Sequence, residues 1–415
     1  MDTKFLATIL APIGRHMAKR FGGHGPVIAI TGSAGKTSTK EAIGLVTQTV
    51  YQGKAIVSSG NLNNDIGLPL SLVGFKSAPS PLAYPFKIIQ AWWRALFMPL
   101  PSAYILEFGI DKPGDMTHLA SIARPNIVVY TNIGNVHLEN YPSHQALIDE
   151  KMALARYMTK GGLIIYNGDN KILSENIAKL PTANALSFGY ESGNDLHLSQ
   201  VDVRSNSTAF TVQYKRKLYK FEIRALGRHH VLAVAPAIAL GLFWETDEKT
   251  IAKAVERYTP EPGRGNIIFG QKDTIVINDT YNASPIATLA ALDVLKVMPG
   301  KSKMAVLGDM LELGSASEAE HREILTKALS SADIVMTVGK RMRQTQLVKP
   351  CFDSPMAAID AVKEQLKPGM IILVKGSQGM RMEMIVKAIM LESSKAAELL
   401  PRQSAAWLKK PFNPV

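Results

Sequence analysis

Residues 31–39, TGSAGKTST, constrain this chain more than any other stretch. They follow an apolar run at residues 26–30 and open a long helical pattern, which predicts a strand, a glycine loop and a helix. In such a unit, loop N–H groups and the helix N-terminus face an anion. We therefore expect a nucleoside triphosphate site with Lys36 on the phosphate charge and Thr37 on Mg²⁺. Ile30 departs from the strict pattern, which has a glycine there.

Composition limits the class of protein. A chain of 415 residues predicts two or three domains, and 46% hydrophobic with 20% charged residues is typical of a soluble globular protein. The single cysteine, Cys351, excludes an internal disulfide and a cysteine-rich zinc site. A reducing, cytoplasmic location is expected.

The formal net charge of +12 is compatible with nucleic acid, an anionic membrane surface or polyanionic small substrates. The sequence contains no helix-turn-helix, zinc-finger or aromatic RNP-like pattern. Nucleotides and a solvated surface account for the charge, so no nucleic-acid partner is expected.

Two segments near the N-terminus are rich in apolar residues. Residues 1–25 predict a basic amphipathic helix, because apolar positions precede Arg15 and Lys19 and a signal peptide has the reverse order. Residues 66–106 contain no acidic residue, and KIIQAWWRALFMPLP within them is a poor membrane-spanning helix because of Arg94 and two prolines. Three interpretations stay open: an insertion packed on its own domain, a lid or subunit contact, and peripheral contact with a membrane.

The spacing of apolar runs predicts an α/β fold. After the loop, such runs recur at 104–108, 127–131 and 163–166, separated by helical patterns, as in parallel sheets. Alternation over 196–223 predicts antiparallel strands, and 258–264 read as a linker. A second series at 274–277, 304–307, 334–338 and 370–374 predicts a Rossmann-like domain. The expected limits are a helix at 1–25, an ATP-binding domain at 26–262 with an insertion at about 77–103, a C-terminal domain at 263–395 and a tail at 396–415.

Three polar residues follow or flank these strands. Glu107 ends an apolar strand, where a carboxylate is costly unless it is paired or bound to metal, and His137 follows the next strand end. Both should lie at the carboxyl edge of the sheet, where open α/β folds bind ligands. Lys151 lies in a helical pattern and reads as a surface lysine. No Ser-His-Asp set or cysteine nucleophile is evident, so positioning and electrostatics are favoured over covalent catalysis.

Taken together, eight motifs resemble the Mur ligases, most closely the MurF type, the UDP-N-acetylmuramoyl-tripeptide–D-alanyl-D-alanine ligases. They run in family order over residues 26–390: TGSAGKTST, GNLNNDIGLPL, ILEFG, TNIGNVHLE with DEK, GRHHVLAVAPAIA, INDTYNASP, VLGDMLELG with His321, and LVKGSQGMRME. The resemblance implies transfer of the ATP γ-phosphoryl group to a carboxylate, followed by attack of an amine to form an amide.

The resemblance also implies roles for individual residues. The catalytic set is Lys36, Glu107, His137 and Lys151, and Thr37, Glu107, His137 and a carbamylated Lys151 would support Mg²⁺. ATP would contact Gly32, Ser33, Ala34, Gly35, Lys36, Thr37, Ser38, Arg264, Asp279 and Tyr281, with Asp279 on the ribose. Asn63, Asn64, Lys375 and Ser377 would contact substrate, the last two by receiving the carboxylate of the amine. Asp309, Glu312 and His321 belong to the same signature with structural roles, and closure of the second domain would exclude water.

Departures from the family pattern leave the carboxylate substrate open. About 25 residues precede the loop, too few for the usual N-terminal domain that holds the UDP sugar, and Asn278, Ser284 and His230 replace Asp, Asn and Asn. Besides the leading function, two alternatives remain: a Mur-like ligase for a different carboxylate, such as a cofactor, polymer or lipid-linked precursor, and a nucleotide-binding interaction module without catalysis. The partners expected are small molecules; the oligomeric state is left open by the sequence.

Overall fold

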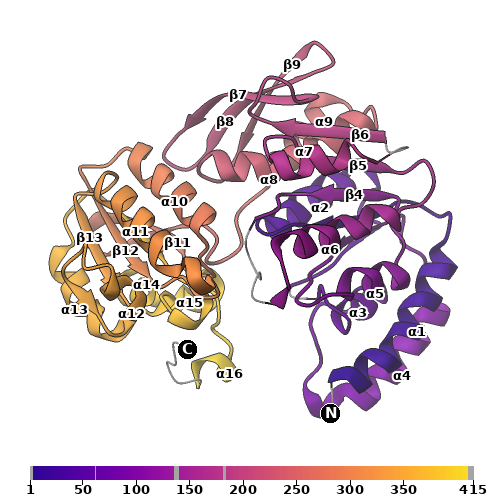
Figure 1. Ribbon diagram of the computed structural model, residues 1–415, viewed down its shortest axis with the longest axis horizontal. Coiled ribbons are helices and arrows are strands. Elements are labelled where there is room, and N and C mark those ends of the chain that lie inside the picture. The colour runs from indigo at the N-terminus through magenta and orange to yellow at the C-terminus, as the bar shows by residue number, and fades with distance from the viewer. Residues whose placement is uncertain (1–2, 61, 135–139, 181–183, 410–415) are drawn as a thin grey trace. The chain divides into compact units, whose positions relative to one another are not determined.

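The computed structural model describes residues 3–60, 62–134, 140–180 and 184–409 (Figure 1). The chain divides into two compact units. The first comprises residues 1–200, 210–221 and 231–258, and the second comprises 201–209, 222–230 and 259–415. Each unit is built around its own sheet.

The first unit contains most of a nine-stranded sheet in the order β2-β3-β1-β4-β5-β6-β7-β8-β9; residues 201–203, 208–209 and 222–223, at the ends of the last three strands, are grouped with the second unit. All documented pairs from β2 to β7 are parallel. The connections at 204–207 and 215–216 are too short for a parallel crossover, so β7, β8 and β9 run antiparallel, as the alternation predicted. The strands are β1 (Val27–Thr31), β2 (Ala55–Val57), β3 (Ala103–Glu107), β4 (Ile127–Tyr130), β5 (Leu163–Asn167), β6 (Asn184–Gly189), β7 (Leu196–Val203), β8 (Thr208–Tyr214) and β9 (Lys217–Ile223).

Helices cover both faces of this sheet, which is why β1, β3 and β4 are buried at every position. One core joins the strands to α1 (Thr3–Phe21), α3 (Gly67–Leu72), α4 (Tyr84–Phe97), α5 (Asp115–Ile122), α6 (His144–Arg156) and α7 (Lys171–Ile177). On the other side, α2 (Lys36–Val50), α8 (Arg228–Phe243) and α9 (Glu248–Glu256) pack together around Gly241, where an added Cβ would lie 2.9 Å from Ile251. In α1, the stripe of Leu6, Leu10, Ile13, Met17 and Phe21 is buried.

The second unit contains a six-stranded sheet in the order β10-β11-β15-β12-β13-β14. Only β10 is antiparallel to its neighbour among the described pairs. The strands are β10 (Asn266–Gly270), β11 (Thr274–Asp279), β12 (Ser302–Gly308), β13 (Ile334–Val338), β14 (Cys351–Phe352) and β15 (Met370–Lys375). One face packs on α10 (Pro285–Val297), α11 (Ser317–Leu329) and α12 (Lys340–Gln344), and the other on α13 (Pro355–Gln365) and α14 (Glu383–Ile389). Short helices α15 (Ala396–Leu399) and α16 (Ala405–Leu408) follow.

The α/β class predicted from the sequence is therefore confirmed, with parallel strands flanked by helices in both units. Within the described residues, no helix combines the length and apolar character that crossing a bilayer requires.

Candidate active site

The glycine loop connects the end of β1 to α2, as predicted. Gly35 adopts the left-handed conformation, with φ of 81°, directly before α2. A Cβ on Gly32 would lie 2.0 Å from Thr131 Oγ1, so only glycine fits there. The Lys36 ammonium folds back and donates to the Gly32 carbonyl at 2.8 Å. The loop is thus a tight turn that holds the Lys36 ammonium at its own rim.

The loop is fastened to the residues that follow β4. The main-chain N–H groups of Ser33 and Ala34 donate to the Asn132 carbonyl at 2.9 Å and to Asn132 Oδ1 at 2.8 Å. Thr131 Oγ1 donates to the Ala34 carbonyl at 2.6 Å. In this conformation the Ala34 N–H is therefore engaged by Asn132 and does not point at a ligand. Sequence reasoning missed the role of Thr131 and Asn132, which hold the loop in shape.

Glu107 lies beside the start of the loop. It ends β3 and pairs in register with Ile30 of β1, one residue before the loop begins. The carboxylate is 3% exposed, and its Oε1 accepts from Asn63 Nδ2 at 3.1 Å. Asn63 is held there by Gly109, whose Cα approaches it so closely that a Cβ would lie 3.0 Å from the amide. Glu107, a predicted metal ligand, and Asn63, a predicted substrate contact, are therefore in contact.

The second carboxylate oxygen of Glu107 lacks a hydrogen-bond donor in the part of the chain that the structure describes. Oε2 is buried and accepts no hydrogen bond from any described residue, although Lys40 Nζ of α2 lies 3.7 Å away. Lys40 offsets the charge from ion-pair distance but donates no hydrogen bond to this oxygen, and a buried oxygen in that state can still accept a closer cation. Oxygen ligands are what Mg²⁺ prefers, and the half-buried loop supplies the Thr37 hydroxyl as well. The donor set of Thr37 and Glu107 thus fits a Mg²⁺–nucleotide complex.

The remaining predicted metal ligands are His137 and Lys151. His137 lies outside the described residues. Among the residues that are described, no three His, Cys, Asp or Glu side chains cluster as a metal site. A metal here would accordingly depend on Thr37, Glu107 and the nucleotide's own oxygens, with Lys151 as the remaining protein candidate.

Lys151 is a buried lysine, contrary to the surface position that its helical pattern alone suggested. It lies in α6 and is 2% exposed. Burial, helped by the positive charge of Lys36, lowers the pKa of Lys151 from 10.5 to about 7. A large part of this amine is therefore uncharged near neutral pH. The uncharged form of a buried amine is the form that can react with CO₂.

In the second unit, Asp279 and Lys375, which were both predicted to contact a ligand, form an ion pair with each other. Asp279 and Lys375 end the neighbouring parallel strands β11 and β15 in register. Lys375 Nζ lies 2.6 Å from Asp279 Oδ2 and also donates to the Asn282 carbonyl at 3.0 Å. Lys375 is 2% exposed, so the pair is largely shielded from solvent. A ligand that uses either group must accommodate this ion pair.

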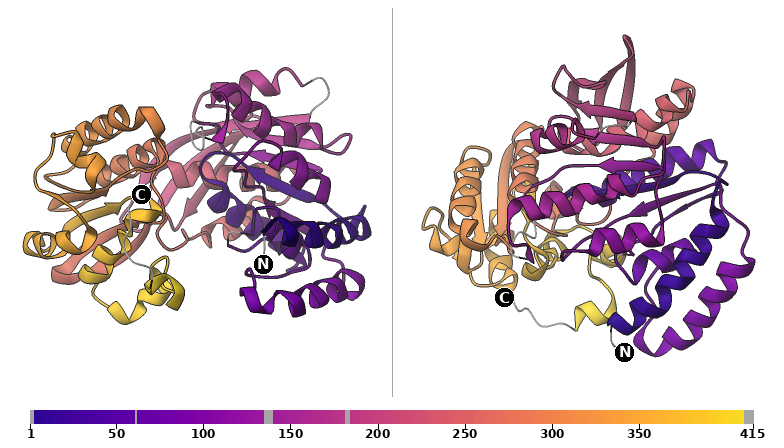
Figure 2. Two further views of the ribbon diagram at one scale, coloured as in Figure 1. Left: turned by 60° about the horizontal axis from the view of Figure 1, so that its bottom comes forward. Right: turned by 45° about the vertical axis from the view of Figure 1, so that its right-hand side comes forward.

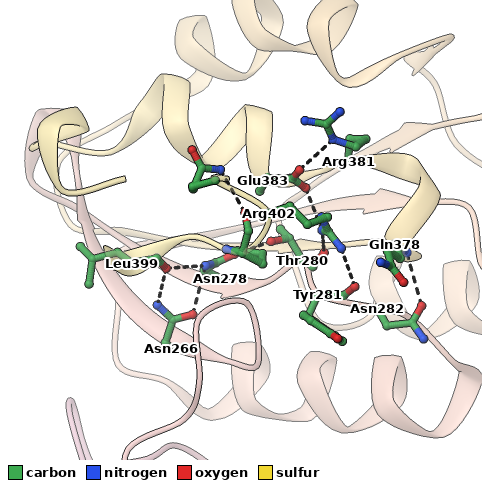
Figure 3. Close-up of polar contacts among 12 residues, drawn as sticks. Asn266, Asn278, Thr280, Tyr281, Asn282, Gln378, Arg381, Glu383, Leu399 and Arg402 are labelled. Atoms are coloured by element: carbon green, nitrogen blue, oxygen red, sulfur yellow. Dashed lines mark hydrogen bonds and ion pairs between the residues drawn. The ribbon is translucent and has the colours of Figure 1, made fainter. Parts of the chain in front are cut away.

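A flat surface is formed by Tyr281 and Arg264. The Arg264 guanidinium lies 4.2 Å from the Tyr281 ring centroid and 3.5 Å from Glu261. Arg402 supports the same segment from behind: it donates to the carbonyl oxygens of Tyr281, at 2.8 Å, and Thr280 (Figure 3). Arg264 and Tyr281, the predicted nucleotide contacts, are therefore stacked on each other, and Arg402 fixes the main chain at Tyr281.

Arg402 belongs to a buried ionic cluster that the sequence did not reveal. Glu383 is 1% exposed and accepts from Arg402 Nη2 at 2.8 Å and from Arg381 Nε at 3.0 Å. The cluster joins the chain after β15 to the segment that carries Tyr281 (Figure 3). Its two arginines and one glutamate come from positions with no recognisable spacing.

The departure at Asn278 also has a physical account. The residue is fully buried and its amide donates to Asn266 Oδ1 at 3.0 Å and to the Leu399 carbonyl at 3.3 Å, while its oxygen accepts from Thr280 (Figure 3). An aspartate has no N–H to donate, so it would face two acceptors. Asparagine at 278 therefore suits this protein's own packing.

Two adjacent histidines lie near the Asp279–Lys375 pair. The rings of His229 and His230 are 4.3 Å apart. Burial lowers the pKa of His229 to about 4, opposed by the charge of Asp279, and burial also lowers the pKa of His230 well below 6.5. Both are therefore neutral at physiological pH. A side chain at Gly265 would be strained, because φ there is 82° and a Cβ would lie 3.1 Å from His230.

Several signature residues have clear structural partners. Asn64 Oδ1 accepts from the Gly67 N–H at the start of α3. The Ser377 hydroxyl accepts from the Leu311 N–H at 2.8 Å and donates to the Ala283 carbonyl at 3.3 Å. Asp309 accepts from the N–H groups that begin α12, and His321 Nε2 accepts from the Met310 N–H. The roles of Asn64 and Ser377 as substrate contacts remain predictions.

Comparison with known proteins gives a consistent result. Residues 96–241 match the Mur ligase middle domain, and residues 263–378 match the Mur ligase glutamate ligase domain. The chain is 32% identical over 372 residues to the UDP-N-acetylmuramoyl-tripeptide–D-alanyl-D-alanine ligase of Bacillus subtilis, covering 87% of this chain and 75% of that protein.

Solved structures agree in fold. The MurF structure from Acinetobacter baumannii superposes with a TM-score of 0.77 at 25% identity, covering 91% of this chain and 79% of that one. The MurF ligase of Thermotoga maritima in complex with ADP shares the fold with a TM-score of 0.78 at 24% identity, covering 92% and 83%. On these similarities and the motifs described above, the chain belongs to the Mur ligase family.

Proposed function

We propose that this protein is an ATP-dependent amide ligase that joins D-alanyl-D-alanine to a UDP-N-acetylmuramoyl-tripeptide in peptidoglycan precursor synthesis. The observation that carries the proposal is the first unit's loop, with Lys36 at its rim and, beside its start, a Glu107 oxygen that accepts no hydrogen bond from the described residues. That arrangement supplies a cation for phosphate and an oxygen for Mg²⁺. The substrates are those in the name of the Bacillus subtilis relative.

In the proposed reaction, a carboxylate oxygen of the tripeptide attacks the γ-phosphorus of ATP and ADP leaves. The amine of the dipeptide then attacks the acyl carbon and phosphate leaves. Lys36 stabilises charge on the transferred group, because a fixed cation is most effective where charge develops. Bound Mg²⁺ would neutralise phosphate charge, held by Thr37 and Glu107. Arg264 and Tyr281 contact the nucleotide, and Lys375 the carboxylate of the incoming amine.

Lys151 has a specific place in the proposal. Since its amine is partly uncharged at pH 7, it can add CO₂ to give a carbamate and release one proton. The product carries a negative charge in place of an uncharged amine, so Lys36 attracts it. A carbamate at Lys151 would also add two oxygens for the metal, together with His137.

The test is a substrate panel scored for phosphate release. With Mg²⁺-ATP, phosphate should appear only when both D-alanyl-D-alanine and UDP-N-acetylmuramoyl-tripeptide are present. Release with a different acid–amine pair, and none with this one, would assign another carboxylate. Nucleotide binding without acceptor-dependent turnover would contradict catalysis. Lys36→Ala should abolish turnover, and an unchanged rate would refute the phosphate role of the loop.

A further inference from the structure

Helix α4 presents its large apolar side chains outward. Phe86, Ile89, Trp93 and Phe97 are 77%, 69%, 61% and 65% exposed. Their spacing of three and four residues places them on one stripe of the helix. The opposite side, with Ala91 and Ala95, is fully buried. An amphipathic helix on a folded domain normally has the reverse arrangement.

The outward stripe extends beyond the helix. Leu82, just before α4, is 92% exposed, and Leu96 is 45% exposed. We call Leu82, Phe86, Ile89, Trp93, Leu96 and Phe97 the α4 apolar face. Scattered exposed apolar residues are ordinary on proteins, but a continuous set of this size marks an interaction site.

The orientation of α4 is fixed by specific contacts. Arg20 of α1 donates to the carbonyls of Ala95 and Met98 at 3.0 and 2.8 Å, at the C-terminal end of α4. Arg94 donates to the carbonyls of Val73 and Gly74, both at 3.2 Å. The helices α1 and α4 lie side by side in both views of Figure 2. The apolar face is therefore held outward by a polar framework on the helix's inner side.

The two chain segments that carry α1 and α4 have Lys and Arg but no acidic residue. Helix α1 contains four basic residues, and the stretch from 66 to 106 contains three, while neither contains an aspartate or glutamate. Arg15 and Lys19 lie on the exposed side of α1, where Phe5 is 53% exposed. An aromatic stripe flanked by basic residues is typical of helices that lie in the interface of anionic membranes.

The same charge opposes self-association. In a symmetric dimer, the same patch from two copies would meet, so positive charges would face positive charges. An anionic lipid surface has the opposite charge, and its acyl chains begin just below the headgroups, within reach of the side chains of the α4 apolar face. Because no described helix could span a bilayer, the contact would be in the plane of the surface.

We propose that the α4 apolar face, with the basic exposed side of α1, docks this protein on an anionic lipid bilayer. Helix α4 lies parallel to the surface, with Phe86, Ile89, Trp93 and Phe97 inserted between headgroups and acyl chains. Arg15 and Lys19 contact lipid phosphates. This goes beyond the proposed ligase activity and does not depend on it.

The test uses the full-length protein and vesicles of phosphatidylcholine with or without phosphatidylglycerol. We expect co-sedimentation with the phosphatidylglycerol vesicles, weakened by salt, and a shift of tryptophan emission to shorter wavelength. The double variant Phe86→Ser/Trp93→Ser should bind at least about tenfold more weakly, because it removes two inserted rings. Arg15→Gln/Lys19→Gln should reduce the preference for phosphatidylglycerol.

A matched control is Phe269→Ser in β10 of the second unit, which removes a ring that is 71% exposed and should leave vesicle binding unchanged. Circular dichroism melting checks that all variants fold. No sedimentation with either vesicle, or equal binding by the Phe86/Trp93 variant, would overturn the proposal. So would a dimer in analytical ultracentrifugation that dissociates in this variant while vesicles fail to bind, because the face would then serve self-association.

Discussion

Removal of the buried amine by Lys151→Met tests the low pKa on which its proposed chemistry depends. The pKa of Lys151 falls from 10.5 to about 7 on folding. Between these values the unfolded chain binds more protons than the folded one, so stability rises with pH across this window. Each pH unit is worth about 1.4 kcal/mol, which gives a cost of about 4 kcal/mol at pH 7 and about 2 kcal/mol at pH 9.

Methionine keeps the apolar stem and has no charge to bury. The variant should therefore be more stable than the parent protein at pH 7, and its advantage should shrink by about 2 kcal/mol at pH 9. Urea unfolding followed by tryptophan fluorescence measures this, because Trp92, Trp93 and Trp244 lie in the same unit as Lys151. The buffer must be free of CO₂ and divalent cations.

If Lys151→Met exceeds the parent protein in unfolding free energy by the same amount at pH 7 and pH 9, the reasoning is refuted. Only a lowered pKa of Lys151 predicts that this difference depends on pH. Adding bicarbonate then tests the carbamate. It should stabilise the parent protein, because the carbamate formed from the uncharged amine is attracted to Lys36, and should leave Lys151→Met unaffected.

Three further predictions follow from the geometry of the two units. Gly32→Ala places a methyl group 2.0 Å from Thr131 Oγ1 and should abolish nucleotide binding in calorimetry, whereas Gly193→Ala, whose Cβ would meet nothing within 4 Å, should bind normally. Glu383→Gln leaves two buried guanidinium groups without their carboxylate and should lower the unfolding free energy in urea by about 3–5 kcal/mol; a loss no larger than that of the exposed change Glu392→Gln would contradict this. Because the pKa of His229 is lowered to about 4, the unfolded chain binds more protons than the folded chain between pH 6.5 and 4. The free energy of unfolding should therefore decrease as the pH is lowered through this window, by up to about 1.4 kcal/mol per pH unit. His229→Gln should show a smaller fall in melting temperature, and an identical fall would contradict the assignment.

The glycine loop, the parallel strands and the family could be predicted from the sequence because each depends on neighbouring residues. A loop such as that at residues 31–39 requires glycine at positions of fixed spacing, and strands buried on both faces read as unbroken apolar runs. The placement of Glu107 at a strand end beside the loop also followed from the sequence, since the carboxyl ends of parallel strands share one edge.

The tertiary structure alone decided the state of the polar groups. The lowered pKa of Lys151, the lack of a donor to Glu107 Oε2, and the ion pair between Asp279 and Lys375 arise from burial and from strands about 96 residues apart in sequence. The outward apolar face of α4 was equally hidden, because an apolar run does not say which side of its helix is covered. Local patterns determine which elements form, whereas charge, burial and exposure depend on long-range packing that no short segment encodes.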